Sequence, residues 1–162
     1  MKAVLMSIQP KWCELIAKGK KTIEVRKSRP KLETPFKCYV YMSQGKLKDL
    51  GTYGDWFYKN RMKVIGEFVC DRIEEIFCYM EASGFDEYLV SDEFLQNCKL
   101  SYAELFDYLK GKDGYGWHIS NLKIYDKPKE LGEFLSPSGT GGVYGNHYLY
   151  RAPQSWCYVE EL

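Results

Sequence analysis

The chain has 162 residues, of which 45% are hydrophobic and 28% are charged, and this is the composition of a globular protein with a core of its own. We expect one domain over residues 1–162, because no linker or repeat divides the sequence. No apolar run is long enough for a membrane span, and residues 3–8 are too short for the apolar part of a signal peptide. We therefore expect a cytoplasmic protein without a membrane partner.

The net charge of +1 is unevenly distributed along the chain. Residues 1–63 carry fifteen Lys or Arg against five Asp or Glu, and residues 64–162 carry eight against seventeen. A polyanion such as RNA would be attracted to the first part, but the two parts could equally interleave in one fold and neutralise each other.

The cysteines and histidines do not form a metal-binding pattern. The six cysteines contain no C-x-x-C pair, and neither His118 nor His147 has a ligand-like spacing from a cysteine. We expect buried free thiols, no metal and no cofactor.

The first quarter of the chain predicts three strands and one helix. Residues 1–8 begin a strand, Pro10 suits the first position of a helix, and Gly19 suits the turn that ends it. The pattern then changes to alternation over residues 22–27, and residues 36–42 form a third strand after a proline-containing loop.

The rest of the chain predicts further strands and short helices. Residues 43–61 and 78–100 are expected to be excursions from the sheet, the first with a short helix and a mixture of aromatic and basic side chains. Ser101 and Glu104 form a capping box that begins a helix. Further strands are expected at residues 63–71, 117–125 and 155–159, and residues 136–147 are expected to be a glycine-rich loop. The pattern predicts an α+β domain with a mixed, partly closed sheet and two or three flanking helices.

The strand at residues 22–27 carries the most informative charges. Thr22, Glu24 and Arg26 share one face of this strand, opposite Ile23 and Val25. A carboxylate and a guanidinium on one strand face indicate either a binding site or a pair that only neutralises itself. Lys21 has the opposite parity, so it reaches the same face only if the glycine turn rotates it.

Gly19, Lys21, Glu24 and Arg26 match the pattern G-x-K-x-x-E-x-R, and through it the chain resembles the ASCH (activating signal cointegrator-1 homology) family of the PUA-like superfamily. Ser7 to Pro10 before the helix is similar to the opening of that family. Tyr115 to Ile119 resembles its later W-x-I strand, and Gln154 to Tyr158 also fits.

The resemblance implies a small PUA-like β-barrel whose cleft accepts RNA, a nucleotide or a modified nucleoside. Some small members of the family hydrolyse acylated cytidines, and ribonuclease activity has been attributed to others. In the amidohydrolase pattern a catalytic threonine follows the motif lysine by three positions, where this chain has Glu24. The neighbouring hydroxyl of Thr22 does not occupy that position.

The motif side chains have chemistry suited to a nucleotide. Arg26 offers a planar fork to a phosphate, and Glu24 can accept hydrogen bonds from an exocyclic amine such as that of cytosine. In a hydrolase, Glu24 would be the general base and Lys21 an electrostatic stabiliser or a nucleophile.

Four further residues are candidates for ligand binding. Gln9 could donate to a ligand or cap the helix after it, and Trp12 and Trp117 could stack a base or simply pack in the core. His118 could transfer protons or be structural. Tyr41, Ser43 and Ser155 are candidate cleft hydroxyls.

We therefore expect a protein that binds RNA or a modified nucleoside through Lys21, Glu24 and Arg26. The alternatives are a small hydrolase acting on N-acylated nucleosides or on RNA, and a protein-interaction module that uses the aromatic side chains of residues 43–61.

Overall fold

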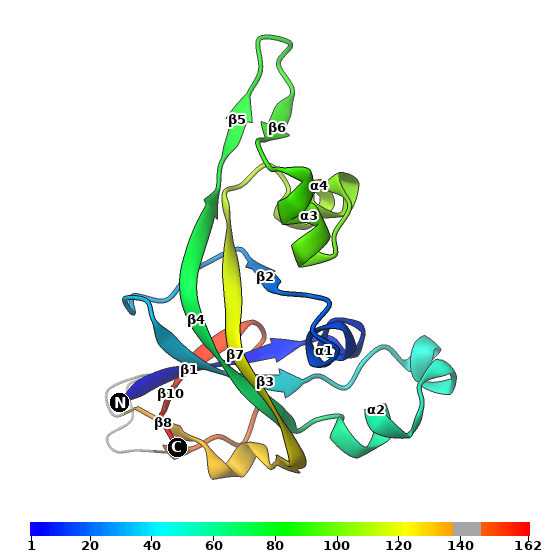
Figure 1. The fold of residues 1–162 in the computed structure, drawn as a ribbon, viewed down its shortest axis with the longest axis vertical. Coiled ribbons are helices and arrows are strands. Elements are labelled where there is room, and N and C mark those ends of the chain that lie inside the picture. The colour runs from blue at the N-terminus through cyan, green and yellow to red at the C-terminus, as the bar shows by residue number, and fades with distance from the viewer. Residues whose placement is uncertain (138–146) are drawn as a thin grey trace.

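A single six-stranded sheet contains both ends of the chain (Figure 1). The computed structural model describes residues 1–137 and 147–162. The strands of the sheet, in chain order, are β1 (Lys2–Ile8), β2 (Ile23–Arg26), β3 (Phe36–Met42), β4 (Val64–Ile76), β7 (Gly114–Lys129) and β10 (Trp156–Glu160). Their order across the sheet is β10-β1-β3-β4-β7-β2. Only β1 and β3 run parallel, and the other neighbours are antiparallel.

The α+β class and the mixed sheet are as expected, but the sheet is not closed into a barrel. Among the described residues, β2 and β10 are edge strands with no backbone ladder between them. A closed barrel requires every strand to pair on both sides, so these six strands form an open sheet and not the β-barrel that the resemblance implies.

Four α-helices lie outside the sheet in the described residues, rather than the two or three expected. They are α1 (Pro10–Ala17), α2 (Asp55–Asn60), α3 (Asp92–Cys98) and α4 (Tyr102–Leu109). The side chain of Ser91 accepts a hydrogen bond from the backbone N–H of Phe94 and so caps the first turn of α3. The capping box predicted for α4 is confirmed, since Ser101 Oγ accepts from the backbone N–H of Glu104, 3.1 Å away.

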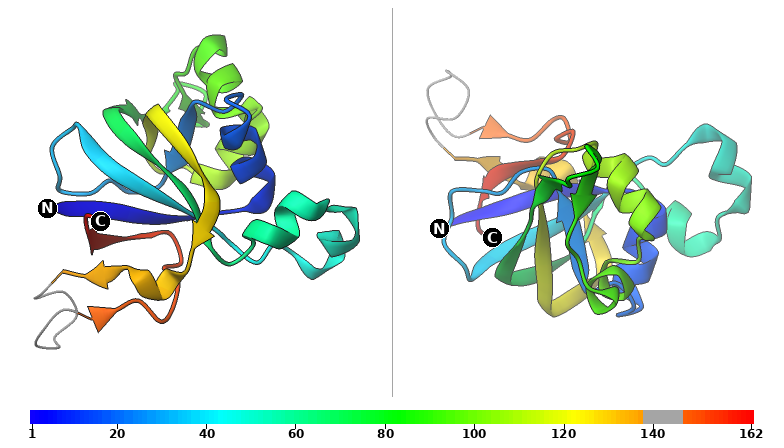
Figure 2. Two further views of the ribbon diagram at one scale, coloured as in Figure 1. Left: turned by 60° about the horizontal axis from the view of Figure 1, so that its bottom comes forward. Right: turned by 90° about the horizontal axis from the view of Figure 1, so that it is seen from above.

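Shorter elements connect these parts. They are the 3₁₀ helices η1 (Leu47–Thr52) and η2 (Leu131–Glu133), the hairpin β5 (Cys78–Met80) and β6 (Asp86–Tyr88), and the pair β8 (Leu135–Ser136) and β9 (His147–Tyr148). The β5-β6 hairpin projects beyond one end of the sheet in Figure 1, and η1 and α2 stand out to one side in Figure 2. Most of the predicted loop at residues 136–147 lies outside the described residues.

The sheet buries side chains on both faces. Val4 and Met6 of β1 pack into a cluster with α1, whereas Ala3 and Leu5 point to a second cluster with Phe134 on the other face. A third cluster holds α3 and α4 against Ile23 and Val25 of β2. Because α3 and α4 cover the apolar face of β2, the charged face of this strand points toward β1 and α1.

Two strands approach each other closely at Gly66 of β4. A Cβ at this position would lie 2.4 Å from the carbonyl oxygen of Lys123, a distance that requires glycine. The register between β4 and β7 also shifts here, between Val64 and Gly66, which gives the long strands their bend.

Candidate functional site

The turn between α1 and β2 rotates Lys21 into the interior. Gly19 has φ +69°, and the backbone N–H groups of Lys20 and Lys21 both donate to the carbonyl of Leu15, at 2.9 and 3.1 Å. Only 3% of Lys21 is exposed. The glycine turn therefore brings Lys21 to the charged face of β2, which strand parity alone does not predict.

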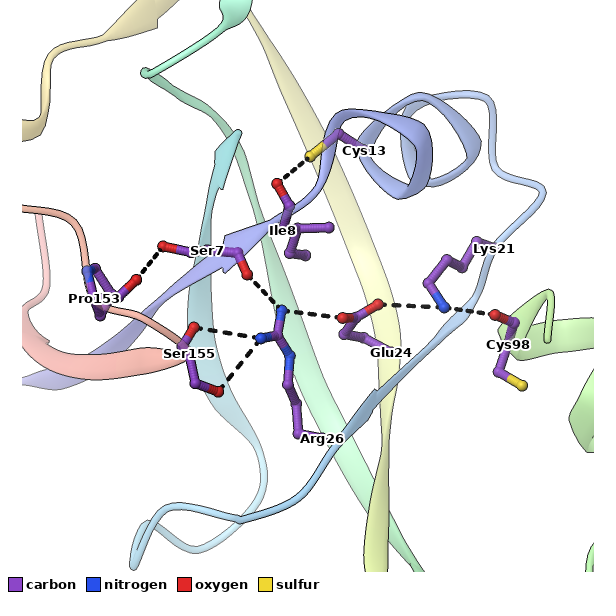
Figure 3. A network of polar contacts seen from close by, with 9 residues as sticks. All are labelled: Ser7, Ile8, Cys13, Lys21, Glu24, Arg26, Cys98, Pro153 and Ser155. Carbon is purple, nitrogen blue, oxygen red and sulfur yellow. Dashed lines mark hydrogen bonds and ion pairs between the residues drawn. The ribbon is translucent and has the colours of Figure 1, made fainter. Parts of the chain in front are cut away.

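Lys21, Glu24 and Arg26 form one buried ion cluster (Figure 3). The Nζ of Lys21 lies 3.2 Å from Oε2 of Glu24, and Nη2 of Arg26 lies 3.0 Å from Oε1 of the same carboxylate. Glu24 and Arg26 are each 6% exposed. Glu24 is therefore held between two cations, one on each oxygen.

Backbone carbonyls complete the contacts of the two cations. Lys21 Nζ donates to the carbonyl of Cys98 at the end of α3, 2.6 Å away. Arg26 Nη2 donates to the carbonyl of Ser7 on β1 at 2.8 Å, and Nη1 donates to the carbonyl and the hydroxyl of Ser155, both at 3.4 Å. A row of polar contacts thus runs from α3 across β2 to β1 and the segment before β10, as Figure 3 shows.

The cluster carries one excess positive charge. It holds two cations and one carboxylate, and all three side chains are buried. In addition, the Nε–H of Arg26 has no hydrogen-bond partner in the part of the chain that the structure describes. A buried charge and a buried donor both disfavour the folded state unless they are balanced, and an anion would balance both.

These side chains line a cavity of about 730 Å³, which we call the motif cavity. Lys27, Ser28 and Gln154 are exposed and line its rim, so the cavity is open to solvent. Other walls come from β1, α1, the end of β3 and α4; they include Ser7, Ile8, Gln9, Trp12, Ser43, Leu100, Glu104, Tyr108 and Ser155. The volume is in the range of sites for small-molecule ligands.

Gln9 and Trp12 both line the motif cavity. Gln9 precedes α1 without a side-chain bond to it, and its exposed side chain lines the motif cavity. Trp12 is partly buried against the core and also lines the cavity, with Lys21 Nζ 5.0 Å from its ring centroid. Ser43 and Ser155 line the cavity as well, whereas Tyr41 is buried among residues of the opposite face of the sheet.

Trp117 and His118 lie elsewhere. Trp117 is 0% exposed and packs against Phe36 and Trp156, which favours its alternative interpretation as a core residue. His118 lines a separate pocket, where its Nε2 lies 3.0 Å from Oε2 of Glu74 and its Nδ1 lies 3.1 Å from Nη2 of Arg72. Neither residue is among those lining the motif cavity.

Several contributors to the site gave no signal in the sequence. Ser7 and Cys98 act through backbone carbonyls, for which any residue type would serve. Leu100, Glu104 and Tyr108 line the cavity because α3 and α4 cover β2, and that packing depends on the tertiary fold. The capping box identified the helix α4 but not its place beside the motif.

The ASCH domain family model matches residues 6–120, which is most of the chain and includes the whole motif. The chain belongs to the ASCH domain family. The matched segment contains Lys21, Glu24 and Arg26, while Ser155, which also contacts Arg26, lies beyond it.

Solved structures of another ASCH domain have the same fold. The ASCH protein from Zymomonas mobilis is 16% identical, with a TM-score of 0.61, and the match covers 98% of this chain and 88% of that one. A tyrosine-to-phenylalanine variant of that protein is 16% identical, with a TM-score of 0.60, and the match covers 99% of this chain and 92% of that one. A serine-to-alanine variant is 15% identical, with a TM-score of 0.59, and the match covers 98% of this chain and 89% of that one. None of the curated proteins compared with the chain matches its sequence.

None of the helices within residues 1–137 and 147–162 is long and apolar enough to cross a membrane. Over the same residues, no three side chains of the His, Cys, Asp and Glu types are grouped as ligands of one metal ion.

Proposed function

We propose that this ASCH domain binds RNA, or a nucleotide or modified nucleoside, in the motif cavity. The observation that carries the proposal is the excess positive charge of a buried cluster whose side chains line the motif cavity, together with the buried Nε–H of Arg26, which has no partner among the described residues. A phosphate accepts hydrogen bonds from a guanidinium and supplies the missing negative charge in one step.

Other walls of the cavity suit the rest of a nucleotide. Each oxygen of Glu24 contacts one cation and retains a further lone pair, which can accept from an exocyclic amine of a base. The partly buried ring of Trp12 offers a surface for stacking. Membership of the ASCH family supports the same proposal, because resemblance to this family of the PUA-like superfamily implies a cleft for RNA, a nucleotide or a modified nucleoside.

A salt titration of RNA binding tests the proposal. We expect the affinity for short single-stranded RNAs to fall as salt is added, because phosphate contacts release counterions. Arg26→Lys keeps the charge but loses the planar fork, so we expect affinity to fall by about tenfold while circular dichroism stays unchanged. Arg29→Lys is the matched control, since Arg29 is exposed and does not line the cavity.

Two results would refute RNA or nucleotide binding in this cavity. One is the absence of binding to RNA, nucleotides and nucleosides alike. The other is binding that is independent of salt and equally unaffected by Arg26→Lys and Arg29→Lys, which would place the ligand elsewhere on the protein.

Hydrolysis of a modified nucleoside or of RNA is a second proposal. It is favoured by the direct contact of Lys21 with Glu24 beside the cavity, since an amine and a carboxylate can serve proton transfer together. Against it, both carboxylate oxygens already contact cations, and the position of the family's catalytic threonine holds Glu24. A chromatographic assay of N-acyl nucleosides and short RNAs decides between binding and turnover. Turnover must disappear in Lys21→Ala and in Glu24→Gln with the fold retained.

The third hypothesis, a protein-interaction module, requires a sealed cleft and an apolar patch on residues 43–61. Leu47 and Tyr58 in this segment are 79% and 49% exposed. However, the exposed residues Lys27, Ser28 and Gln154 on the rim of the motif cavity favour a ligand in that cavity over a protein-interaction module.

A further inference from the structure

A second cavity lies on the other side of Trp12. It also has a volume of about 730 Å³, and we call it the outer cavity. Its walls are the first half of α1 and the segment from the end of β3 through η1: Gln9, Pro10, Lys11, Trp12, Glu14, Ser43, Gln44, Gly45, Lys46, Asp49, Thr52 and Tyr53. Nothing in the motif accounts for this second cavity.

The two cavities adjoin each other. Gln9, Trp12 and Ser43 line both, so these three residues form the partition between them. Gln9 and Ser43 follow the ends of the parallel strands β1 and β3, and the backbone N–H of Ser43 donates to the carbonyl of Ile8 at 2.9 Å. The carboxyl ends of neighbouring parallel strands meet at one edge of a sheet, and this edge therefore carries both cavities.

The far wall of the outer cavity is anchored to the helices. Gly45 has φ +79°, and a Cβ placed there would lie 3.2 Å from Cγ of Pro10 and 3.6 Å from the ring of Phe57. Tyr53 stacks on Phe57 with ring centroids 4.1 Å apart and an interplanar angle of 25°. The segment is thus held against α1 and α2, with the aromatic side chain of Tyr53 in the cavity lining.

Cations flank the partition on both sides. Lys11 Nζ of the outer cavity lies 4.4 Å from the ring centroid of Trp12, and Lys21 Nζ of the motif cavity lies 5.0 Å from it. Within the described residues, no carboxylate lies within ion-pair distance of Lys11 or Lys46. The lining of the outer cavity contains two carboxylates, Glu14 and Asp49. Glu14 already forms an ion pair with Lys18, 2.6 Å away.

We propose that the outer cavity is a second nucleotide subsite, so that the preferred ligand is an RNA of at least two nucleotides rather than a single nucleoside. One nucleotide occupies the motif cavity, the linking phosphate crosses the partition near Lys11 and Lys21, and the next base enters the outer cavity beside Tyr53. This inference rests on the proposed function. It adds to that function a minimum ligand length of two nucleotides, which the motif alone does not define.

Three ligands of increasing length test the proposal on the full chain: cytidine 5′-monophosphate, cytidine 3′,5′-bisphosphate and the 5′-phosphorylated dinucleotide pCpC, with the same series in adenine. The bisphosphate has the phosphates of the dinucleotide without its second base. Because a tethered second base binds intramolecularly, we expect the dinucleotide to bind about tenfold tighter than the bisphosphate in calorimetry.

Variants of the outer cavity should remove this gain alone. Lys46→Ala and Tyr53→Ala are each expected to reduce dinucleotide affinity toward that of the bisphosphate, while the affinity for the monophosphate stays unchanged. Lys48→Ala is the matched control, since Lys48 is an exposed lysine of the same segment outside both linings. Lys46 is itself exposed, so its substitution leaves the core intact.

The possible outcomes separate the two proposals. If the monophosphate binds and the dinucleotide binds no tighter than the bisphosphate, the second subsite is refuted and the motif site stands. A gain that persists in Lys46→Ala and Tyr53→Ala places the second base elsewhere and also refutes it. If none of the ligands binds, the second subsite is refuted, and the binding tests with longer RNAs and nucleosides decide the proposed function separately.

Discussion

The guanidinium of Arg26 on β2 donates to the backbone carbonyl of Ser7 on β1 over 2.8 Å, although the two strands are separated by three others in the sheet. With its longer contacts to Ser155, Arg26 joins one edge strand to the region of the other edge. A side chain therefore bridges the gap that a barrel would close with a backbone ladder.

Arg26→Ala should destabilise the protein as well as weaken binding. It removes the bridge and leaves Glu24 with a single cation, and removal of one partner from a buried pair costs about 3 kcal/mol. Urea denaturation measures the free energy of unfolding. Arg29→Ala, whose contact with Glu75 is 3.9 Å long and exposed, should change it by less than about 0.5 kcal/mol. Equal stability of the two variants would show that the bridge does not hold the sheet edges.

Glu24→Gln should destabilise the free protein by about 3 kcal/mol, because two buried cations lose their shared carboxylate. An added anion should partly replace it. We therefore expect the thermal midpoint of this variant to rise more in phosphate than in chloride of equal ionic strength. Glu33→Gln is the control, since Glu33 is exposed and lines neither cavity. An identical response of both variants to phosphate would contradict anion binding by the cluster.

Trp12→Ala should weaken nucleotide binding by about 1–3 kcal/mol, the contribution of one stacked base. Trp117→Phe is the informative comparison, because Trp117 is fully buried and lines neither cavity. It should lower stability and leave nucleotide affinity unchanged in calorimetry. If both substitutions reduce affinity equally, the effect on binding comes from the core rather than from stacking.

The free energy of unfolding should fall as the pH rises above 9. Burial, and secondarily the charge of Glu24, raises the pKa of the Cys13 thiol well above its ordinary value of 9.0, and burial does the same for Cys38. These thiols ionise in the unfolded chain first, so their contribution to stability is complete below pH 9 and is lost above it. Each thiol adds a slope of about 1.4 kcal/mol per pH unit.

Cys38→Ala checks this pH dependence. Urea denaturation between pH 7 and pH 10.5 should give a shallower loss of stability above pH 9 in the variant than in the wild type. Parallel curves would show that Cys38 does not contribute to the pH dependence.

A strand whose β-forming residues run without interruption was predictable from the sequence, and strands with interrupted patterns were not. The strand at residues 36–42 has the predicted bounds, because its β-forming residues run without a break. β4 continues past the predicted end at residue 71 to Ile76, through a charged stretch that pairs with β7. The hairpin of β5 and β6 was missed because its strands have only three residues each.

The motif positions were predictable, but their surroundings were not. Alternation placed Glu24 and Arg26 on one face, as the structure shows, since side chains alternate along any strand. It could not place Lys21, because the left-handed turn at Gly19 sets the direction of that side chain. The contacts with Ser7, Cys98 and Ser155 depend on how distant segments meet, and no local pattern encodes them.

The position of Ser155 has a consequence for protein synthesis. β1 leaves the ribosome long before β10, with which it pairs, and Arg26 contacts Ser155 just before β10. Domains form during translation as their segments emerge, and contacts between distant segments form last. The motif is therefore translated before Ser155, and the complete site can assemble only when the segment leading into β10 has emerged. A nascent chain stalled before residue 155 would carry every motif residue without the finished binding site.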